Sequence, residues 1–94
     1  MSRWDVYGDP NLEEQLVKHH GSPPWDALRV LVRRLEWQAD EAGHPLSYPW
    51  SDSLRRAVIE DETEVYGVVE YMIESRRHQI ARILTVDWLP DITT

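Results

Sequence analysis

Two apolar runs near the end of the printed sequence place the strongest constraint on the fold. The run from Val65 to Ile73 is rich in Val, Tyr and Ile, which are favoured in strands. The run from Gln79 to Trp88 is likewise rich in residues that favour strands. Only the polar segment Glu74 to His78 separates them, which is too short for the crossover between parallel strands. The runs therefore predict an antiparallel hairpin. Since both carry apolar residues on both faces, we expect the sheet to be central or covered on both sides.

Further strands are predicted on either side of a helical region. Leu54 to Glu60 reads as the strand before the hairpin, and the polar residues 61–64 form the turn that joins them. Trp4 to Tyr7 alternates apolar and polar residues and predicts a short first strand. Residues 44–51 hold two prolines and two aromatic residues, and we expect a loop there.

Two helices are predicted between the first strand and the sheet. The first begins at Asp9–Pro10, a cap followed by a proline in the first turn, and ends at Gly21. The second begins at Ser22–Pro23, and its apolar stripe runs from Leu28 to Ala42 at helical spacing before Gly43. The predicted class is thus α+β: two N-terminal helices after a short first strand, packed on a mainly antiparallel sheet (βααβββ).

Length and composition bound the rest of the interpretation. A chain of 94 residues is enough for one domain, predicted to span residues 1–94, and too short for two. There is no cysteine, and the N-terminal residues hold no apolar core of the kind a signal peptide needs. No apolar run approaches the roughly 20 residues of a membrane helix. These features predict a cytoplasmic protein without membrane contact.

The charge of the chain argues against general binding to a phosphate backbone. Acidic residues outnumber basic ones 17 to 10, and the formal net charge is −7. Nucleic-acid binding usually needs a positive surface, whereas an acidic surface suits a basic partner. No Gly-rich phosphate loop, catalytic-triad spacing or zinc motif is present in the sequence. We therefore expect no metal site and no cofactor.

The order of the predicted elements resembles the RelE/ParE superfamily. The resemblance covers nearly the whole chain and is carried by these segments: Trp4 to Tyr7 followed by Leu12 to Leu16, Leu28 to Ala42 closing in Gly43–His44–Pro45–Leu46, Leu54 to Val58, Val65 to Tyr71, and Gln79 to Val86. It implies a toxin of a two-gene toxin–antitoxin module. RelE-like members cleave messenger RNA on the ribosome, and ParE-like members poison DNA gyrase. Both are held inactive by an antitoxin segment on the toxin surface.

If the chain is an enzyme, the resemblance implies a metal-independent endoribonuclease. That chemistry needs a base, a positive group for the phosphate and an acid for the leaving oxygen. Arg55 and Arg56 sit where the family places basic residues, and Arg82 on the last strand is the third catalytic candidate. The sequence departs from the family pattern at Gly67, where an arginine is common, and at Asp87–Trp88, where a histidine or tyrosine is common.

The most basic local run consists of Arg76, Arg77 and His78 at the predicted hairpin tip. It is either an exposed, solvated turn or a contact to phosphate or an acidic partner. The acidic cluster of Glu60, Asp61, Glu62 and Glu64 reads as a solvated turn, with a divalent-cation site as the alternative.

A second hypothesis is a non-catalytic protein–protein interaction module on the same fold. It accounts for the acidic charge and for the five tryptophans, a residue enriched at interfaces. The predicted interface comprises Trp37 on the second helix with Tyr48 and Trp50 in the aromatic loop. Val30 and Trp37 form a minor helical stripe that either covers the flank of the helix or contacts a partner. Under either hypothesis we expect an antitoxin-like protein partner, with RNA or gyrase as further possible targets.

Overall fold

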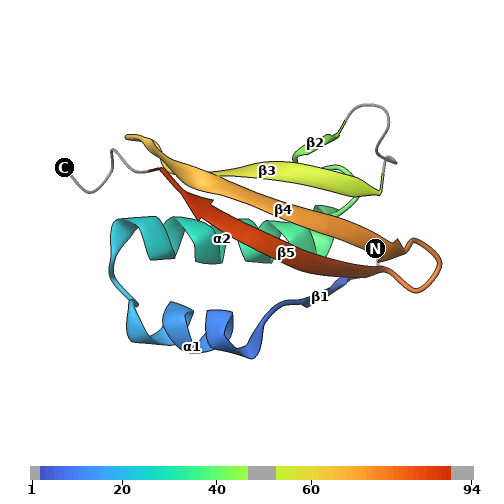
Figure 1. Cartoon of the computed structure of the whole chain (residues 1–94), viewed down its shortest axis with the longest axis horizontal. Helices are drawn as coiled ribbons and strands as arrows, with labels where there is room; N and C mark the ends of the chain where they lie inside the picture. The colour runs from blue at the N-terminus through green and yellow to red at the C-terminus, as the bar shows by residue number, and fades with distance from the viewer. Residues whose placement is uncertain (1–2, 47–52, 90–94) are drawn as a thin grey trace.

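A five-stranded sheet forms one layer of the protein and two helices form the other (Figure 1). The computed structural model describes residues 3–46 and 53–89, and the predicted α+β class is confirmed. The elements are β1 (Asp5–Tyr7), α1 (Pro10–Lys18), α2 (Pro23–Gln38), β2 (His44–Pro45), β3 (Leu54–Glu60), β4 (Val65–Ser75) and β5 (Ile80–Trp88).

The strands lie in the order β1-β5-β4-β3-β2. β3, β4 and β5 form the predicted antiparallel meander, and β1 pairs in parallel with β5, Asp5 opposite Ile80. The short strand β2 was not predicted, because we expected a loop at His44–Pro45. These two residues pair with Arg56 and Arg55 at the end of the sheet, a position where a proline in a strand is tolerated.

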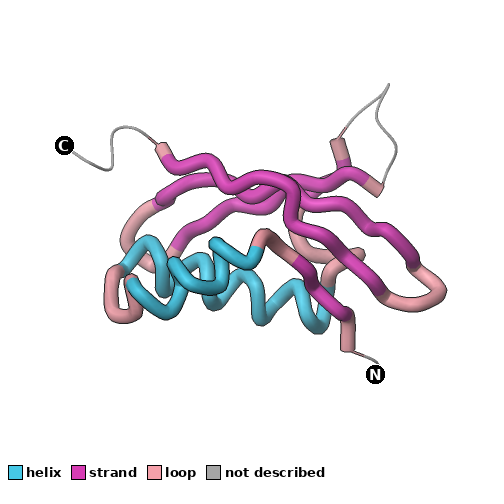
Figure 2. Tube along the Cα trace, turned by 60° about the horizontal axis from the view of Figure 1, so that its bottom comes forward, coloured by secondary structure: helices cyan, strands magenta, loops and turns pink. Residues whose placement is uncertain are grey.

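Both helices lie on the same side of the sheet, as Figure 2 shows, so the expectation of cover on both sides is wrong. Within the described residues, no helix covers the other face. Apolar outward residues misled the prediction, since Val58, Val68 and Met72 point away from the helices. The core lies between the layers and includes Leu28 and Leu35 from α2 and these sheet residues: Ala57, Ile59, Val69, Tyr71, Ile73, Ala81 and Ile83.

A β-bulge changes which residues of β5 face the helices. Tyr71 pairs with Ile83 and the preceding Glu70 pairs with Thr85, so Leu84 is an extra residue on β5. One extra residue reverses the alternation of side chains beyond it. Leu84 is consequently exposed while Val86 packs against the core. Strict alternation along the strand would place Leu84 and Val86 on one face, and the bulge separates them.

Local sequence signals set the starts of both helices. The Asp9 carboxylate accepts a hydrogen bond from the amide of Asn11 at 2.9 Å, which confirms the predicted cap. At α2 the Ser22 side chain makes no capping bond, and the carboxylate of Asp26 accepts from the amide of Gly21 instead. Both helices end earlier than predicted, α1 at Lys18 and α2 at Gln38, and residues 19–21 and 39–41 form turns.

Gly67 marks a close approach between β4 and β5. A Cβ atom at this position would lie 2.3 Å from the carbonyl oxygen of Asp87 and 3.0 Å from the Cα of Trp88. These are backbone atoms, so relief requires the strands to separate. The resemblance to the RelE/ParE superfamily implies an arginine at position 67. This position has no room for a side chain in the protein.

We expect Gly67→Ala to lower the free energy of unfolding by about 1–3 kcal/mol, the usual cost of overpacking. Urea denaturation measures the loss. Gly8→Ala is the matched control, because its Cβ would meet the flexible end of Leu12 at 3.3 Å and the Cβ of Ile83 at 3.9 Å, an ordinary van der Waals distance, and no backbone atom is that close. Equal effects of the two substitutions would contradict the close approach described above.

Candidate functional site

The three arginines predicted to be catalytic do not lie together. Arg55 and Arg56 are neighbours in β3 and therefore point to opposite faces of the sheet. Arg55 faces the helices and is 7% exposed, whereas Arg56 lies on the open face. Arg82 is also exposed and lies on the open face, since it pairs with Met72 across β4 and β5. The structure thus brings Arg56 and Arg82 to one face and separates both from Arg55.

Arg55 is part of a buried polar cluster at the end of α2. Its guanidinium donates to the carbonyl oxygens of Ala42 at 3.3 Å and Gly43 at 3.2 Å, and to the Tyr71 hydroxyl at 3.3 Å. The Tyr71 hydroxyl lies 2.7 Å from the carbonyl oxygen of Ala39 and also reaches that of Ala42. Burial raises the pKa of Tyr71, while Arg55 opposes the rise. The phenol therefore stays protonated and able to donate.

Each cation on the open face lies beside a carboxylate. Arg56 is 3.8 Å from Glu70 on the neighbouring strand, and Arg82 pairs with Glu74. The Arg82 guanidinium also lies 5.5 Å from the centroid of the Tyr7 ring, within the range of a cation–π contact. A phosphate at either arginine would have to compete with the carboxylate already beside it.

The basic run at the hairpin tip is exposed. Arg76, Arg77 and His78 follow the end of β4, and the amide of His78 donates to the Ser75 hydroxyl at 3.0 Å. Gln79 completes the turn with a φ of 54°. The tip forms a solvated turn, and its role as a contact for phosphate or an acidic partner stays a prediction.

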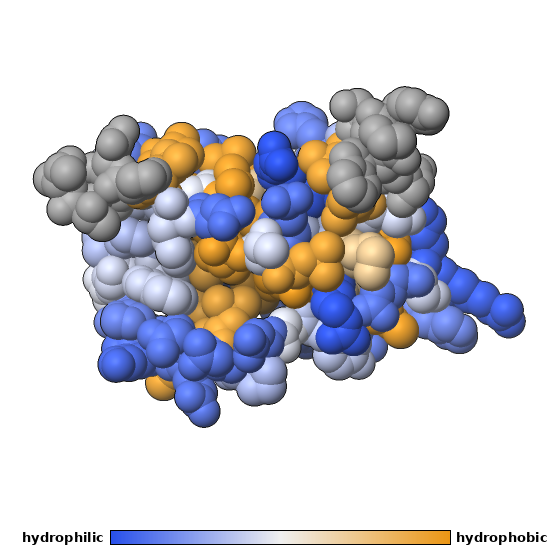
Figure 3. All heavy atoms as spheres, viewed as in Figure 1, coloured by the Kyte–Doolittle hydropathy of each residue, from blue (hydrophilic) through white to orange (hydrophobic). Residues whose placement is uncertain are grey.

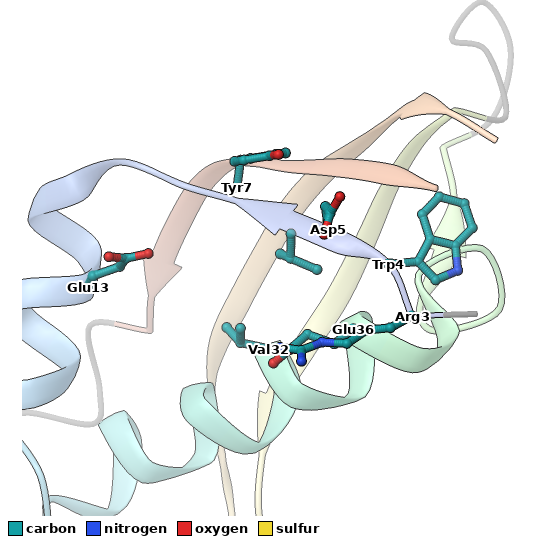
Figure 4. A pocket seen from close by; sticks show the side chains of 8 residues that line it. Arg3, Trp4, Asp5, Tyr7, Glu13, Val32 and Glu36 are labelled. Atoms are coloured by element: carbon teal, nitrogen blue, oxygen red, sulfur yellow. The ribbon is translucent and has the colours of Figure 1, made fainter. Parts of the chain in front are cut away.

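Figure 4 shows a polar cavity between β1 and the helices. Arg3 and Glu36 form an ion pair there, and the other lining residues are Trp4, Asp5, Val6, Tyr7, Glu13 and Val32. The backbone amide of Trp4 also donates to the carbonyl oxygen of Glu36. The only cation of this cavity is already paired, so the contacts anchor β1 to α2 and do not assemble a base with a nucleophile.

The face of the sheet opposite the helices mixes apolar and charged side chains. Figure 3 shows hydrophobic residues spread over the strands among hydrophilic ones. Val58 lies opposite Val68, and Leu54 lies opposite Met72, with the Arg56–Glu70 pair between these rows. Apolar cross-strand pairs of this kind stabilise the sheet. They also leave apolar area open to a partner.

A groove runs between α2 and the outer side of β3. It consists of two cavities, of about 240 and 410 Å³, which share Glu60. We call it the α2–β3 groove. The lining residues are Leu31, Arg34, Glu41, Gly43, His44, Ala57, Val58 and Glu60 in the first cavity, and Pro23, Asp26, Ala27, Val30, Glu60, Asp61 and Glu62 in the second. Apolar and acidic side chains line it together, and the cavity next to the β3–β4 turn is the more apolar of the two.

The predicted stripe on the second helix, Val30 and Trp37, reaches this groove at Val30. Val30 is 65% exposed and Trp37 is 53% exposed. Since Val30, Arg34 and Trp37 are spaced i, i+4 and i+7, they share one side of α2, and the first two line the groove. The other two predicted interface residues, Tyr48 and Trp50, fall outside the described residues.

The turn after β3 is organised around Asp61. Its carboxylate accepts hydrogen bonds from the hydroxyl and amide of Thr63, from the amide of Glu64 and from the Tyr66 hydroxyl. These bonds, chiefly those from the Thr63 and Tyr66 hydroxyls, hold the pKa of Asp61 far below its ordinary value of 3.8. The same contact raises the pKa of Tyr66. The end of the groove therefore keeps a negative charge down to low pH.

Sequence reasoning missed the structural role of Arg55 and the groove itself. Arg55 and Arg56 are identical in type and adjacent, so only the pairing of β3 with its neighbours tells them apart. A usable signal was the alternation of β3, which places Arg55 with Ala57 and Ile59 on one face. The groove depends on α2 lying beside β3, and no local pattern encodes that placement.

The described helices include none that is both long and apolar enough to cross a membrane. In the described part of the chain, no three residues of the metal-binding types come together. Comparisons with protein-family models, with curated proteins and with solved structures find no match to this chain.

We expect Arg55→Met to lower the free energy of unfolding by about 1–3 kcal/mol, because the carbonyl oxygens of Ala42 and Gly43 each lose the guanidinium as a donor. Arg56→Met is the matched control on the exposed face and should cost no more than about 0.5 kcal/mol. Chemical denaturation of both variants measures the difference. If Arg55→Met leaves the free energy of unfolding unchanged, the structural role assigned to Arg55 is wrong.

Asp61→Asn tests the charged turn through pH. A carboxyl whose pKa is lowered on folding stabilises the fold above its unfolded value and loses that contribution as pH falls toward its folded value. Wild type should therefore be more stable than Asp61→Asn at pH 7, and the gap should shrink as pH falls below about 4. Thermal unfolding at pH 7 and pH 3 measures this gap, with Glu62→Gln on the same turn as control. A gap that stays constant with pH would contradict the assignment.

Proposed function

We propose that this chain is a non-catalytic protein-binding domain on a RelE/ParE-like scaffold. The dispersal of the candidate catalytic cations is the observation that carries the proposal. Arg55 is buried on one side of the sheet, and Arg56 and Arg82 sit beside carboxylates on the other. Phosphate chemistry needs positive and proton-transferring groups that converge on one point. Binding a protein needs no such convergence.

Two surface features support the binding role. Trp37 is a large aromatic residue exposed on α2, and tryptophan is the residue type most enriched in the energetic centres of interfaces. It shares one side of α2 with Val30 and Arg34, which line the α2–β3 groove. The net charge of −7 suits a basic partner surface.

The link to the RelE/ParE superfamily rests on the order of elements. A strand, two helices and then an antiparallel meander occur here in the order that the resemblance implies. A toxin-like protein that acts by binding its target, as the gyrase-inhibiting branch does, fits this proposal. The messenger-RNA-cleaving alternative retains one supporting feature, namely that Arg56 and Arg82 share the open face.

Site-specific crosslinking tests the binding role. A photoreactive phenylalanine analogue at Trp37 should give one discrete adduct with a host protein. The same analogue at Val17, a 73% exposed residue on α1, is the matched control and should give none. Identical adduct patterns from both positions, or no adduct from Trp37, would count against a partner surface on α2.

Induced expression separates binding from RNA cleavage. We expect primer extension on cellular messenger RNA to show no new cleavage ends when the chain is expressed alone. The double variant Arg56→Ala with Arg82→Ala should then give the same pattern as wild type. New ends that disappear in the double variant would instead establish the endoribonuclease and overturn the non-catalytic assignment.

A further inference from the structure

β3 has an edge that the described strands leave open. Its ladder with β2 ends at Arg56, although β3 continues to Glu60. The carbonyl oxygen of Ser53 accepts from Ile73 of β4, and that of Leu54 accepts from Leu46 on the β2 side. Backbone groups of successive strand residues point alternately to the two neighbouring strands. The N–H and C=O of Val58 therefore point to the β2 side, beyond the last residue that β2 reaches.

The α2–β3 groove lies along this open edge. Ala57, Val58 and Glu60 of β3 line its sheet side, and Leu31, Ala27 and Val30 of α2 line its other side. Gly43 closes the end next to β2, since a Cβ there would lie 2.4 Å from the carbonyl oxygen of Arg56. An extended segment placed in line with β2 would thus have backbone partners on one side and the apolar side chains of α2 on the other.

The charges of the groove define the chemistry of the segment. Its lining contains the carboxylates of Asp26, Glu41, Glu60, Asp61 and Glu62 against the single guanidinium of Arg34. Four of these five carboxylates belong to the cavity at the β3–β4 turn. Lysine or arginine in the segment would find opposite charge there while its aliphatic stem lies against Pro23, Ala27 and Val30.

We propose that an extended segment of a partner protein, alternating apolar and basic residues, binds by adding as a strand to the open edge of β3. This inference rests on the proposed protein-binding function and names its mode and partner chemistry. Main-chain hydrogen bonds to Val58 supply affinity, and the groove selects the side chains. Apolar residues face α2, and basic residues reach the acidic end at Glu60 and Glu62.

β5 has a second open edge, but its surroundings select no partner. β1 pairs only with Ile80 to Arg82, which leaves the remainder of β5 beside α1. The cavity there is lined by apolar residues and by Asp9, Asn11, Gln15 and Thr85, with Asp9 the only ionisable group. The Asp9 carboxylate already caps α1. The charge preference at β3 is therefore the reason to assign the strand addition to that edge.

A peptide library provides the probe. The peptides are about six residues long, the usual length of a strand, with Lys or Arg at alternate positions and Val, Ile or Leu between them. Fluorescence anisotropy with the whole chain should detect binding, and a matched library with Glu or Asp at the charged positions should bind at least tenfold more weakly. Hydrogen exchange of wild type should show new protection of the Val58 amide in the bound state. Absence of that protection overturns the proposal.

Variants locate the binding to the edge and the charge. Val58→Pro removes the outward N–H without touching the ladder to β4, and proline is tolerated on edge strands, so the fold should persist and binding should fall at least tenfold. Glu60→Lys with Glu62→Lys should weaken binding similarly. The matched control, Glu13→Lys with Glu14→Lys on α1, makes the same change in net charge and should leave binding within twofold of wild type.

The outcomes separate this inference from the broader proposal. If neither library binds, or if Val58→Pro and a backbone N-methylated peptide leave binding unchanged, strand addition is excluded. A Trp37 adduct in cells would still support a protein partner in that case. If the Trp37 adduct is also absent, both the strand addition and the protein-binding function are excluded.

Discussion

The buried contact between Arg55, Tyr71 and the end of α2 is the interaction on which the remainder of the structure depends. Arg55 and Tyr71 are directly opposite each other on β3 and β4, and together they reach three carbonyl oxygens after the helix. A buried guanidinium is costly unless its donors are satisfied. A slip of the strand register by one residue would turn it to the other face. The contact therefore fixes the pairing of β3 with β4 and the point at which the chain leaves α2.

The placement of the surface features follows from that fixed point. Because Ala42 and Gly43 are held beneath β3, the chain must cross the edge of the sheet at Arg56, where only glycine fits. β2 then pairs for two residues and leaves the remainder of the β3 edge beside α2. One buried cation thus defines the groove, although it does not line it.

The elements that depend on local sequence patterns were predicted correctly. The features that depend on tertiary contacts were missed. Caps and turn residues located both helices, and the apolar runs located the meander. The bulge at Leu84 was invisible, because one extra residue in an apolar run leaves composition unchanged while it reverses the outward face. Arg55 was assigned to catalysis from the family resemblance, and nothing in the local sequence indicates the carbonyl oxygens that its guanidinium contacts. Trp37 was a sound candidate for exposure, since its position lies off the main apolar stripe of the helix.

The parallel pairing of β1 with β5 also has a consequence for how the chain folds. Asp5 to Tyr7 lie near one end of the sequence and their partners, Ile80 to Arg82, lie near the other. During synthesis the first strand has no place in the sheet until almost every other element has left the ribosome. Contacts between residues so far apart in the sequence require a long loop to close. The entropy lost in this closure slows folding. Trp4 is almost fully buried next to β1 in the folded domain. It can therefore become buried only after the last strand has been synthesised.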